Sequence, residues 1–261
     1  MIDVKLGKLP ARRDERTIEL PGIFEGRVLP PVPDSFDVDQ ALGLGIPLPM
    51  FANDKWGDCV IAARAHMTLR FEGFEQKSVI AITDRDVLNE YWKEQQSCAP
   101  KRLLLAHPDN GLNELDSLKA WRKGWKAAGK PYNIYAFAGI NWKIHRQIMA
   151  SIYLLRGALA GIALPISAQA QTGTGLVWDV DNTTDGEPGN WGLHAVDLKA
   201  YNPIGPIGVT WGALQQMSWA FVDRYFDESY GVVDNRNKFM KNSPVDVAEL
   251  DSYLHALREC G

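Results

Sequence analysis

Apolar residues follow a helical spacing in the first part of the chain and form short, strand-like runs in the later part. Helices are predicted over about 60–71, after Thr83, after Asn113 or Leu115, and over about 142–156. Strands are predicted over 158–166, 193–201, 207–211 and 230–233. Because the helices precede the strands instead of alternating with them, the pattern predicts an α+β fold with a helical lobe and an antiparallel β lobe.

The same pattern predicts the domain boundaries. One domain is expected over 32–261, divided into a helical lobe (32–125), a β lobe (126–235) and a C-terminal helix (236–261). Residues 1–31 form an extended N-terminal arm, because several prolines hold the backbone away from helical geometry. We interpret this arm first as a strap lying on the body of the protein. A propeptide-like segment or an arm that binds a protein partner is the alternative.

Composition excludes several classes of function. The net charge of −4 argues against a nucleic-acid binder, and the longest apolar run, 158–166, is shorter than the roughly 20 residues of a membrane span. The N-terminus has no apolar signal-peptide core, and three cysteines cannot all pair within the chain. We therefore expect a cytoplasmic protein with free thiols, or a virion-associated one if the gene belongs to a phage. No zinc-type Cys/His spacing or glycine-rich phosphate loop occurs, so neither a metal nor a cofactor is expected.

Cys59 stands where chemistry favours a reactive thiol. It begins the predicted buried helix, and free N–H groups at a helix N-terminus stabilise a thiolate. Gly57 allows the backbone to pass close to a substrate. Asn53, six residues before the cysteine, could donate its amide to an oxyanion together with the Cys59 N–H. A buried cysteine acting as a small apolar side chain is the alternative.

His194 is the expected base. It begins a predicted strand after a glycine-rich segment and should share a face with Val196 and Leu198. His66 lies seven residues beyond Cys59 on the same helix, about 10 Å away, and is expected in the core. The strand over 207–211 should place Thr210 or Val209 beside the imidazole, with Trp211 covering it. Only the threonine hydroxyl or a backbone carbonyl could then orient the ring.

These segments resemble the papain-like cysteine peptidases. Asn53, Gly57 and Cys59 resemble the segment that carries the family's oxyanion donor and nucleophile, and 191–196 resembles its Asp-His-Ala-Val strand. His194 follows Cys59 by 135 residues (194 − 59), within the interval of about 130–150 found in papain and the cathepsins. Segment 109–112 resembles the Asn-Gly-Gly turn of the substrate groove, and 209–212 resembles Asn-Ser-Trp-Gly. The resemblance covers about 32–233. It implies a groove lined by Trp56, Gly57, Asn110, Gly111, Trp191, Gly192 and Trp211.

The sequence departs from the family at three positions. Asn53 replaces a glutamine, Val60 replaces a tryptophan, and Val209 stands where the family has the asparagine that orients the histidine. Two functions remain open. The first is a cysteine hydrolase, most simply a peptidase acting on peptides or proteins through Cys59, His194, Asn53 and Thr210. The second is a papain-like scaffold without catalysis that serves as a structural or binding protein, for example in a phage particle.

Overall fold

A computed structural model describes residues 4–24, 28–98 and 109–235. The C-terminal helix predicted within 236–261 lies outside these residues. The helices are α1 Leu20–Ile23, α2 Val38–Leu42, α3 Cys59–Gln76, α4 Asp84–Cys98, α5 Glu114–Lys123, α6 His145–Leu155, α7 Ser167–Gln171 and α8 Trp219–Tyr225, with a 3₁₀ turn at Thr184–Gly186. The strands are β1 Phe36–Asp37, β2 Trp125–Ala127, β3 Lys130–Tyr132, β4 Ile134–Gly139, β5 Ala158–Leu164, β6 Gly192–Tyr201, β7 Pro206–Thr210, β8 Ala213–Gln216 and β9 Phe226–Asp234.

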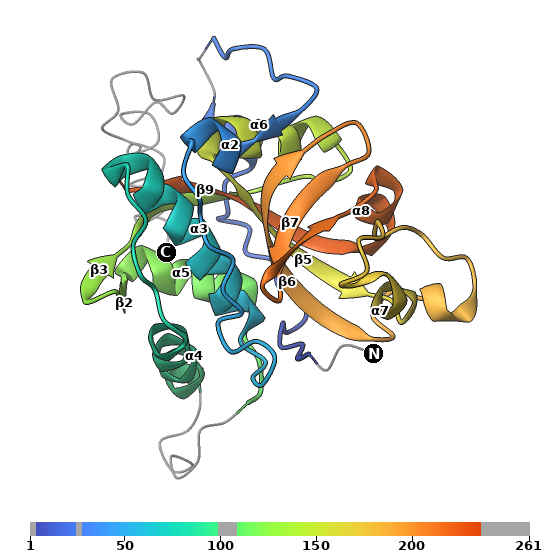
Figure 1. Cartoon of the computed structure of the whole chain (residues 1–261), viewed down its shortest axis with the longest axis horizontal. Coiled ribbons are helices and arrows are strands. Elements are labelled where there is room, and N and C mark those ends of the chain that lie inside the picture. Colours follow the sequence, from blue (N-terminus) through green and yellow to red (C-terminus); the bar gives the residue numbers. More distant parts are fainter. Residues whose placement is uncertain (1–3, 25–27, 99–108, 236–261) are drawn as a thin grey trace.

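One antiparallel sheet organises the later part of the chain. Its strands run in the order β4-β9-β5-β6-β7-β8, and β1 pairs with β6. Helices α3, α4 and α5 lie together to one side of this sheet, and α3 packs against β6 (Figure 1). The combination of these helices with an antiparallel sheet confirms the predicted α+β class, although α6, α7 and α8 lie between strands of the sheet in the sequence.

Alternate residues of the central strands serve two separate apolar cores. On β5, Ala160 and Ile162 pack in a cluster with residues of α1, α6 and α8, whereas Leu159 packs in a second cluster with α3 and α5. The same division occurs on β6, where Val196 belongs to the first cluster and Ala195 to the second. The sheet is therefore covered on both faces, which explains the continuous apolar runs in its central strands.

The helix that begins at Cys59 is buried on every side. Every residue from Cys59 to Gly73 is buried, and the helix ends at Lys77 in a left-handed conformation (φ 54°). The predicted range of 60–71 was right in position and too short by five residues at the C-terminal end. Complete burial explains why the apolar residues of this segment show no single face.

Arg70 ties this helix to the sheet. Its guanidinium is fully buried, donates to the Asp39 carboxylate of α2 at 2.7 Å, and pairs with the Asp197 carboxylate of β6. Asp197 thus points toward α3, in keeping with the expectation that it does not orient His194. The ion pair fixes the distance between the helix that carries the cysteine and the strand that carries the histidine.

Substitution of Arg70 by methionine should lower the free energy of unfolding by about 3–5 kcal/mol, because it leaves the fully buried Asp197 carboxylate without its cation. Urea denaturation followed by circular dichroism measures this change. Arg85→Met, at an exposed position of α4, is the matched control and should change stability by no more than about 0.5 kcal/mol. Equal losses in the two variants would contradict the structural role of Arg70.

Several elements were not predicted. Strand β4 pairs with β9 at the edge of the sheet, and β2 and β3 form a small hairpin around Ala128 and Gly129, both at positive φ. The predicted long loop over 172–190 contains only the short 3₁₀ turn at Thr184–Gly186.

In the part of the chain that the structure describes, no helix combines the length and the apolar character needed to cross a membrane.

Candidate active site

Cys59 lies at the N-terminus of α3 with its thiol directed at backbone N–H groups. The residue is 1% exposed, and its sulfur accepts hydrogen bonds from the N–H groups of Ala195 and Gly7. Ala195 follows His194 on β6, so the thiol lies beside the peptide unit that carries the imidazole. The helix N-terminus and the histidine strand therefore meet at this sulfur.

Two residues at the C-terminal end of β7 contact the His194 ring. Its Nε2 lies 2.6 Å from the Thr210 hydroxyl, and its ring stacks on Trp211 with centroids 4.2 Å apart. Among the described residues, the other nitrogen, Nδ1, has no hydrogen-bond partner. If Nε2–H donates to the threonine, Nδ1 carries the free lone pair that a general base needs. Thr210 thus supplies the orienting contact that Val209 cannot.

The N-terminal arm runs through this site in extended form. The Lys5 N–H donates to the Asn53 carbonyl at 3.1 Å, and the Lys8 N–H donates to the Leu193 carbonyl at 3.3 Å. Leu112 binds the arm twice, through its N–H to the Gly7 carbonyl at 2.8 Å and its carbonyl to the Leu9 N–H at 2.8 Å. These bonds use only the backbone of the arm, as in the binding of an extended peptide to a groove.

Gly7 occupies the narrowest point of the path. A Cβ atom on Gly7 would lie 1.7 Å from the Gly57 carbonyl oxygen, and one on Gly111 would lie 2.2 Å from the Gly7 carbonyl oxygen. Only glycine fits at position 7. The arm therefore covers Cys59 by close backbone contact, a position that both the strap and the propeptide-like interpretation allow.

Solved structures of similar shape identify the architecture. The chain is similar to xylellain, a cysteine protease from Xylella fastidiosa, with a TM-score of 0.63 and 14% identity over 88% of this chain and 96% of that one. It is also similar to the cysteine protease and lectin-like domains of a surface layer associated protein of Clostridium difficile, with a TM-score of 0.58 and 11% identity over 89% of this chain and 56% of that one. A third similar structure is procathepsin B from Trypanosoma congolense, with a TM-score of 0.54 and 11% identity over 88% of this chain and 87% of that one.

The chain has a papain-like fold. The resemblance predicted from the sequence is thus confirmed at the level of the fold. No protein-family model and no curated protein sequence matches the chain, and identities of 11–14% concern the fold alone.

Gly57 and Gly111, two residues that the resemblance assigns to a substrate groove, both lie in close contact with the arm. One hydrogen-bond network links them. The Gly57 N–H donates to Asp109 Oδ1 at 2.8 Å, the Tyr91 hydroxyl donates to the same oxygen at 2.7 Å, and the Gly111 N–H donates to Tyr91 Oη at 3.0 Å. Tyr91 was not predicted, and Asp109 was not named as a site residue although it begins the segment 109–112 that the resemblance singled out.

The three tryptophans that the resemblance assigns to the groove lie in two different places. Trp211 stacks on His194 and donates its indole N–H to the Lys5 carbonyl at 3.2 Å, and Trp191 packs on Trp211 at 5.5 Å. Trp56 instead packs edge-on against Trp92 of α4 at 5.4 Å. The first pair thus lies beside the imidazole, while the ring of Trp56 packs toward the helical lobe.

Asn53, Asn110 and Gly192 complete the set of predicted residues. The Asn53 amide donates one of its two N–H groups to the Trp56 carbonyl at 2.9 Å. Asn110 is exposed and donates its backbone N–H to Gln95 at 2.9 Å. Gly192 lies under the arm, where a Cβ would come within 2.6 Å of Leu6 Cδ1.

Burial holds both reactive groups in their neutral forms. It raises the pKa of Cys59 to about 12, because desolvation outweighs the two N–H donors, and it lowers the pKa of His194 to about 3. A thiol and a neutral imidazole are therefore the species present at neutral pH under the arm. Access of water to the groove would relieve the desolvation of both groups.

The free energy of unfolding should decrease as pH is lowered, because two histidines are buried in their uncharged form. Burial lowers the pKa of both His66 and His194 to about 3. Between pH 6.5 and pH 3 the unfolded chain binds protons that the native state does not, so each histidine lowers stability by up to about 1.4 kcal/mol per pH unit as pH falls.

Urea denaturation at pH 6 and pH 5 tests this dependence. The loss of stability between the two values should be about 1 kcal/mol smaller for His194→Gln than for the unmodified chain. Thr210→Val, which removes the neighbouring hydroxyl but no titrating group, should keep the original dependence. Identical losses in the His194 variant and the unmodified chain would show that this imidazole is not buried in its neutral form.

Proposed function

We propose that this papain-like chain is a cysteine hydrolase that cleaves amide bonds in peptides or proteins and that residues 4–9 cover its site. The observation that carries the proposal is the meeting of the Cys59 thiol with the His194–Ala195 peptide unit at one end of a groove that already binds extended backbone. The fold supports the proposal at a coarser level, since the structures of similar shape are cysteine proteases.

The reaction follows from the functional groups present. With the arm displaced, His194 takes the thiol proton and the Cys59 sulfur attacks the substrate carbonyl carbon. The Cys59 N–H and the Asn53 amide would hold the oxyanion. The C–N bond breaks as the imidazolium gives its proton to the leaving amine. Water, deprotonated by His194, then attacks the thioester, releasing the acid and restoring the thiol.

Thr210 and Trp211 act as positioning residues in this scheme. The hydroxyl holds Nε2 so that Nδ1 is left to take the thiol proton. The indole shields from water the face of the imidazole on which it stacks. The Thr210 contact is what makes an active imidazole compatible with Val209 at the neighbouring position.

Cleavage of a mixed peptide library tests the proposed function. We expect the Gly7→Ala chain, in which the added methyl group displaces the arm, to create new peptide termini that mass spectrometry detects. Prior treatment with iodoacetamide should suppress them, because it blocks the nucleophile. An absence of new termini, or termini that persist after the treatment, would overturn the proposal.

A non-catalytic papain-like scaffold is the second candidate function. The observation that favours it is the full cover of the site, since Cys59 and His194 are each 1% exposed and the arm occupies the groove. Under this function the arm is a permanent strap. The Gly7→Ala substitution would then lower the free energy of unfolding without producing any cleavage.

A further inference from the structure

The arm places one charged side chain in the interior of the protein. The Lys8 side chain is fully buried, although lysine is among the residue types least often buried. Its Nζ lies 2.6 Å from Glu228 Oε1 and 2.9 Å from Asp227 Oδ2, both at the start of β9. The ammonium thus ends in a pocket of acidic character, which we call the Lys8 pocket: Gly161, Glu114, Asp227, Glu228 and Tyr230.

The pocket is shaped for a long, unbranched side chain. A Cβ atom on Gly161 would lie 2.2 Å from Lys8 Cε and 2.6 Å from Glu228 Cγ, so glycine at this position of β5 leaves the space that the lysine stem fills. Tyr230 donates its hydroxyl to Glu228 Oε2 at 2.8 Å and leaves Oε1 to the ammonium. Both the floor and the acidic end are therefore fixed by residues of the sheet.

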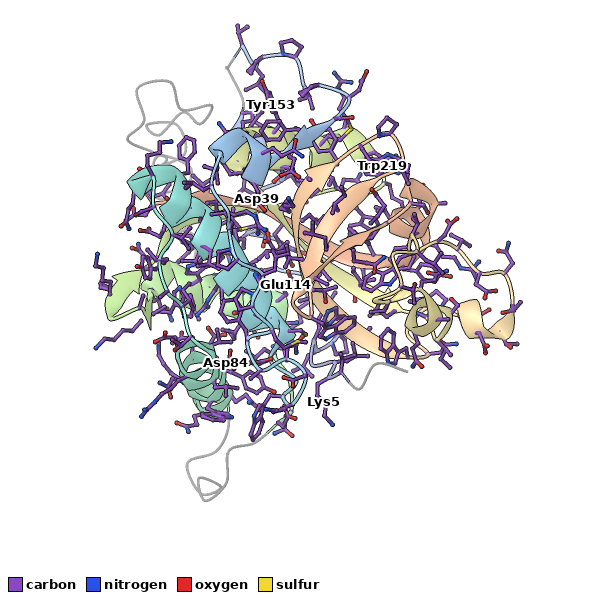
Figure 2. All side chains as sticks on the ribbon, viewed as in Figure 1. Lys5, Asp39, Asp84, Glu114, Tyr153 and Trp219 are labelled. Carbon is purple, nitrogen blue, oxygen red and sulfur yellow. The ribbon has the colours of Figure 1, made fainter. Side chains whose placement is uncertain are left out.

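The pocket holds more carboxyl groups than one ammonium can pair with. Glu114, at the start of α5, is 1% exposed, and neither of its carboxylate oxygens has a hydrogen-bond partner among the described residues. It lies near the centre of the molecule between the helices and the sheet (Figure 2). Burial and the neighbouring carboxylates raise the pKa of Glu114 well above its usual range, and burial raises that of Glu228. Withdrawal of Lys8 would leave three carboxyl groups without a cation.

Strand pairing connects the Lys8 pocket to the thiol. Gly161 lies opposite Ala195 on one side and opposite Glu228 on the other. Ala195 donates its N–H to the Cys59 sulfur, so the pocket begins one strand away from the reactive atom. Its entrance is also the place where the Leu193 carbonyl holds the arm backbone.

The path of the arm past the thiol indicates on which side of the scissile bond a side chain in the Lys8 pocket would lie. Gly7 lies at the sulfur, Lys5 lies on the Trp211 side, and Lys8 lies on the opposite side. His194, stacked on Trp211, must protonate the leaving amine, so the amine part of a substrate occupies the Trp211 side. The Lys8 pocket then receives a side chain from the acyl part.

We infer that the Lys8 pocket selects peptide substrates with a lysine or arginine side chain within two residues of the scissile bond on its acyl side. This inference rests on the proposed cysteine hydrolase function. In the covered protein the arm supplies the basic side chain itself. Its chain direction is opposite to that of a substrate, because Lys5 lies on the amine side and Lys8 on the acyl side. The Leu112 and Leu193 backbone groups that hold the arm are open to an extended peptide in either direction. Selectivity comes from the buried carboxylates, because an apolar or acidic side chain there would leave them unpaired.

Labelling by dipeptidyl vinyl sulfones tests the inference without requiring turnover. The probes carry Lys, Leu or Glu next to the reactive group or one residue before it, with Gly at the other position. Mass spectrometry measures the rate at which each adds to Cys59 in the full Gly7→Ala chain. We expect a lysine probe to react at least about tenfold faster than its leucine counterpart, as a charge-assisted hydrogen bond predicts, and the glutamate probe to react slowest.

Glu228→Gln assigns the preference to the pocket. In this variant the advantage of lysine over leucine should fall at least about fivefold, whereas Glu187→Gln, the same change at an exposed position, should keep it. Equal rates with lysine and leucine probes in the Gly7→Ala chain, or a lysine preference unchanged by Glu228→Gln, would overturn the inference and leave the hydrolase function standing. Failure of every probe to label Cys59 would instead overturn the proposed function on which the inference depends.

Discussion

Replacement of Cys59 by alanine in the Gly7→Ala chain should lower the rate of peptide hydrolysis by at least about 10³-fold, because it removes the nucleophile on which both chemical steps depend. The rate is measured as the appearance of new amino groups from a defined peptide with a lysine one residue before the cleaved bond. His194→Gln should produce a loss of similar size, since the thiol would have neither a base nor a source of the proton for the leaving amine.

Two further variants make this result specific. Cys98→Ala, the same chemical change at another cysteine, should leave the rate unchanged. Thr210→Val should reduce kcat about 10–100-fold with little change in KM, because it removes an orienting hydrogen bond without removing the base. Hydrolysis that continues at the original rate in the Cys59 variant would place catalysis elsewhere in the protein.

Substitution of Gly7 by alanine should raise the rate of Cys59 alkylation by iodoacetamide at least about tenfold at pH 7.5, because displacement of the arm exposes the thiol to the reagent. A Cβ at this position would lie 1.7 Å from the Gly57 carbonyl oxygen, so the arm must leave its path. The upper bound comes from the thiol. A fall of its pKa from about 12 to the ordinary value near 8.5 would raise the thiolate fraction about 10³-fold.

Gly45→Ala is the matched control for this experiment. It adds the same methyl group at a position where no atom lies within 4 Å, and it should leave the alkylation rate at that of the unmodified chain. Gly7→Val, with a larger side chain, should give a rate at least as high as Gly7→Ala. Alkylation of the Gly7 variants at the unmodified rate would show that the arm does not control access to the thiol.

Periodicity was sufficient to predict the elements that position the site. The helix from Cys59 and the strand at His194 are long segments with consistent apolar patterns, and tertiary packing agrees with their local preferences. Strand β4 was missed because its sequence, IYAFAG, contains two alanines and a glycine and its stability comes from pairing with β9. The β2–β3 hairpin was missed for a related reason, since only Gly129 marks its turn.

The order of residues along the groove was also accessible from the sequence. Thr210 beside the imidazole and Trp211 over it follow from the pairing of two neighbouring strands, and the structure places both as predicted. Asn53 has a contact that the sequence did not predict. Its position six residues before Cys59 indicated an amide near the thiol, and the local turn also brings the Trp56 carbonyl within 2.9 Å of that amide.

The occupied groove could not be predicted from local patterns. The contacts of the arm join Lys5, Gly7 and Lys8 to residues more than 40 positions away, and no periodicity reports a contact of that range. The Lys8 pocket has the same character, because Glu114, Gly161 and Glu228 come from a helix and two strands that meet only in the fold. Proline content indicated that the arm is extended; where it lies is decided by tertiary contacts.

The activation of Cys59 by His194 is tested most directly by alkylation at pH 6 in the Gly7→Ala chain with and without His194→Gln. The account predicts that Cys59 reacts at least about tenfold faster than Cys98 and Cys260 in the same digest, because an imidazolium partner lowers the pKa of a thiol below its ordinary value. It also predicts that this advantage disappears in the His194 variant. A Cys59 rate equal to that of the other two cysteines, or one that is unchanged by loss of the imidazole, would contradict it.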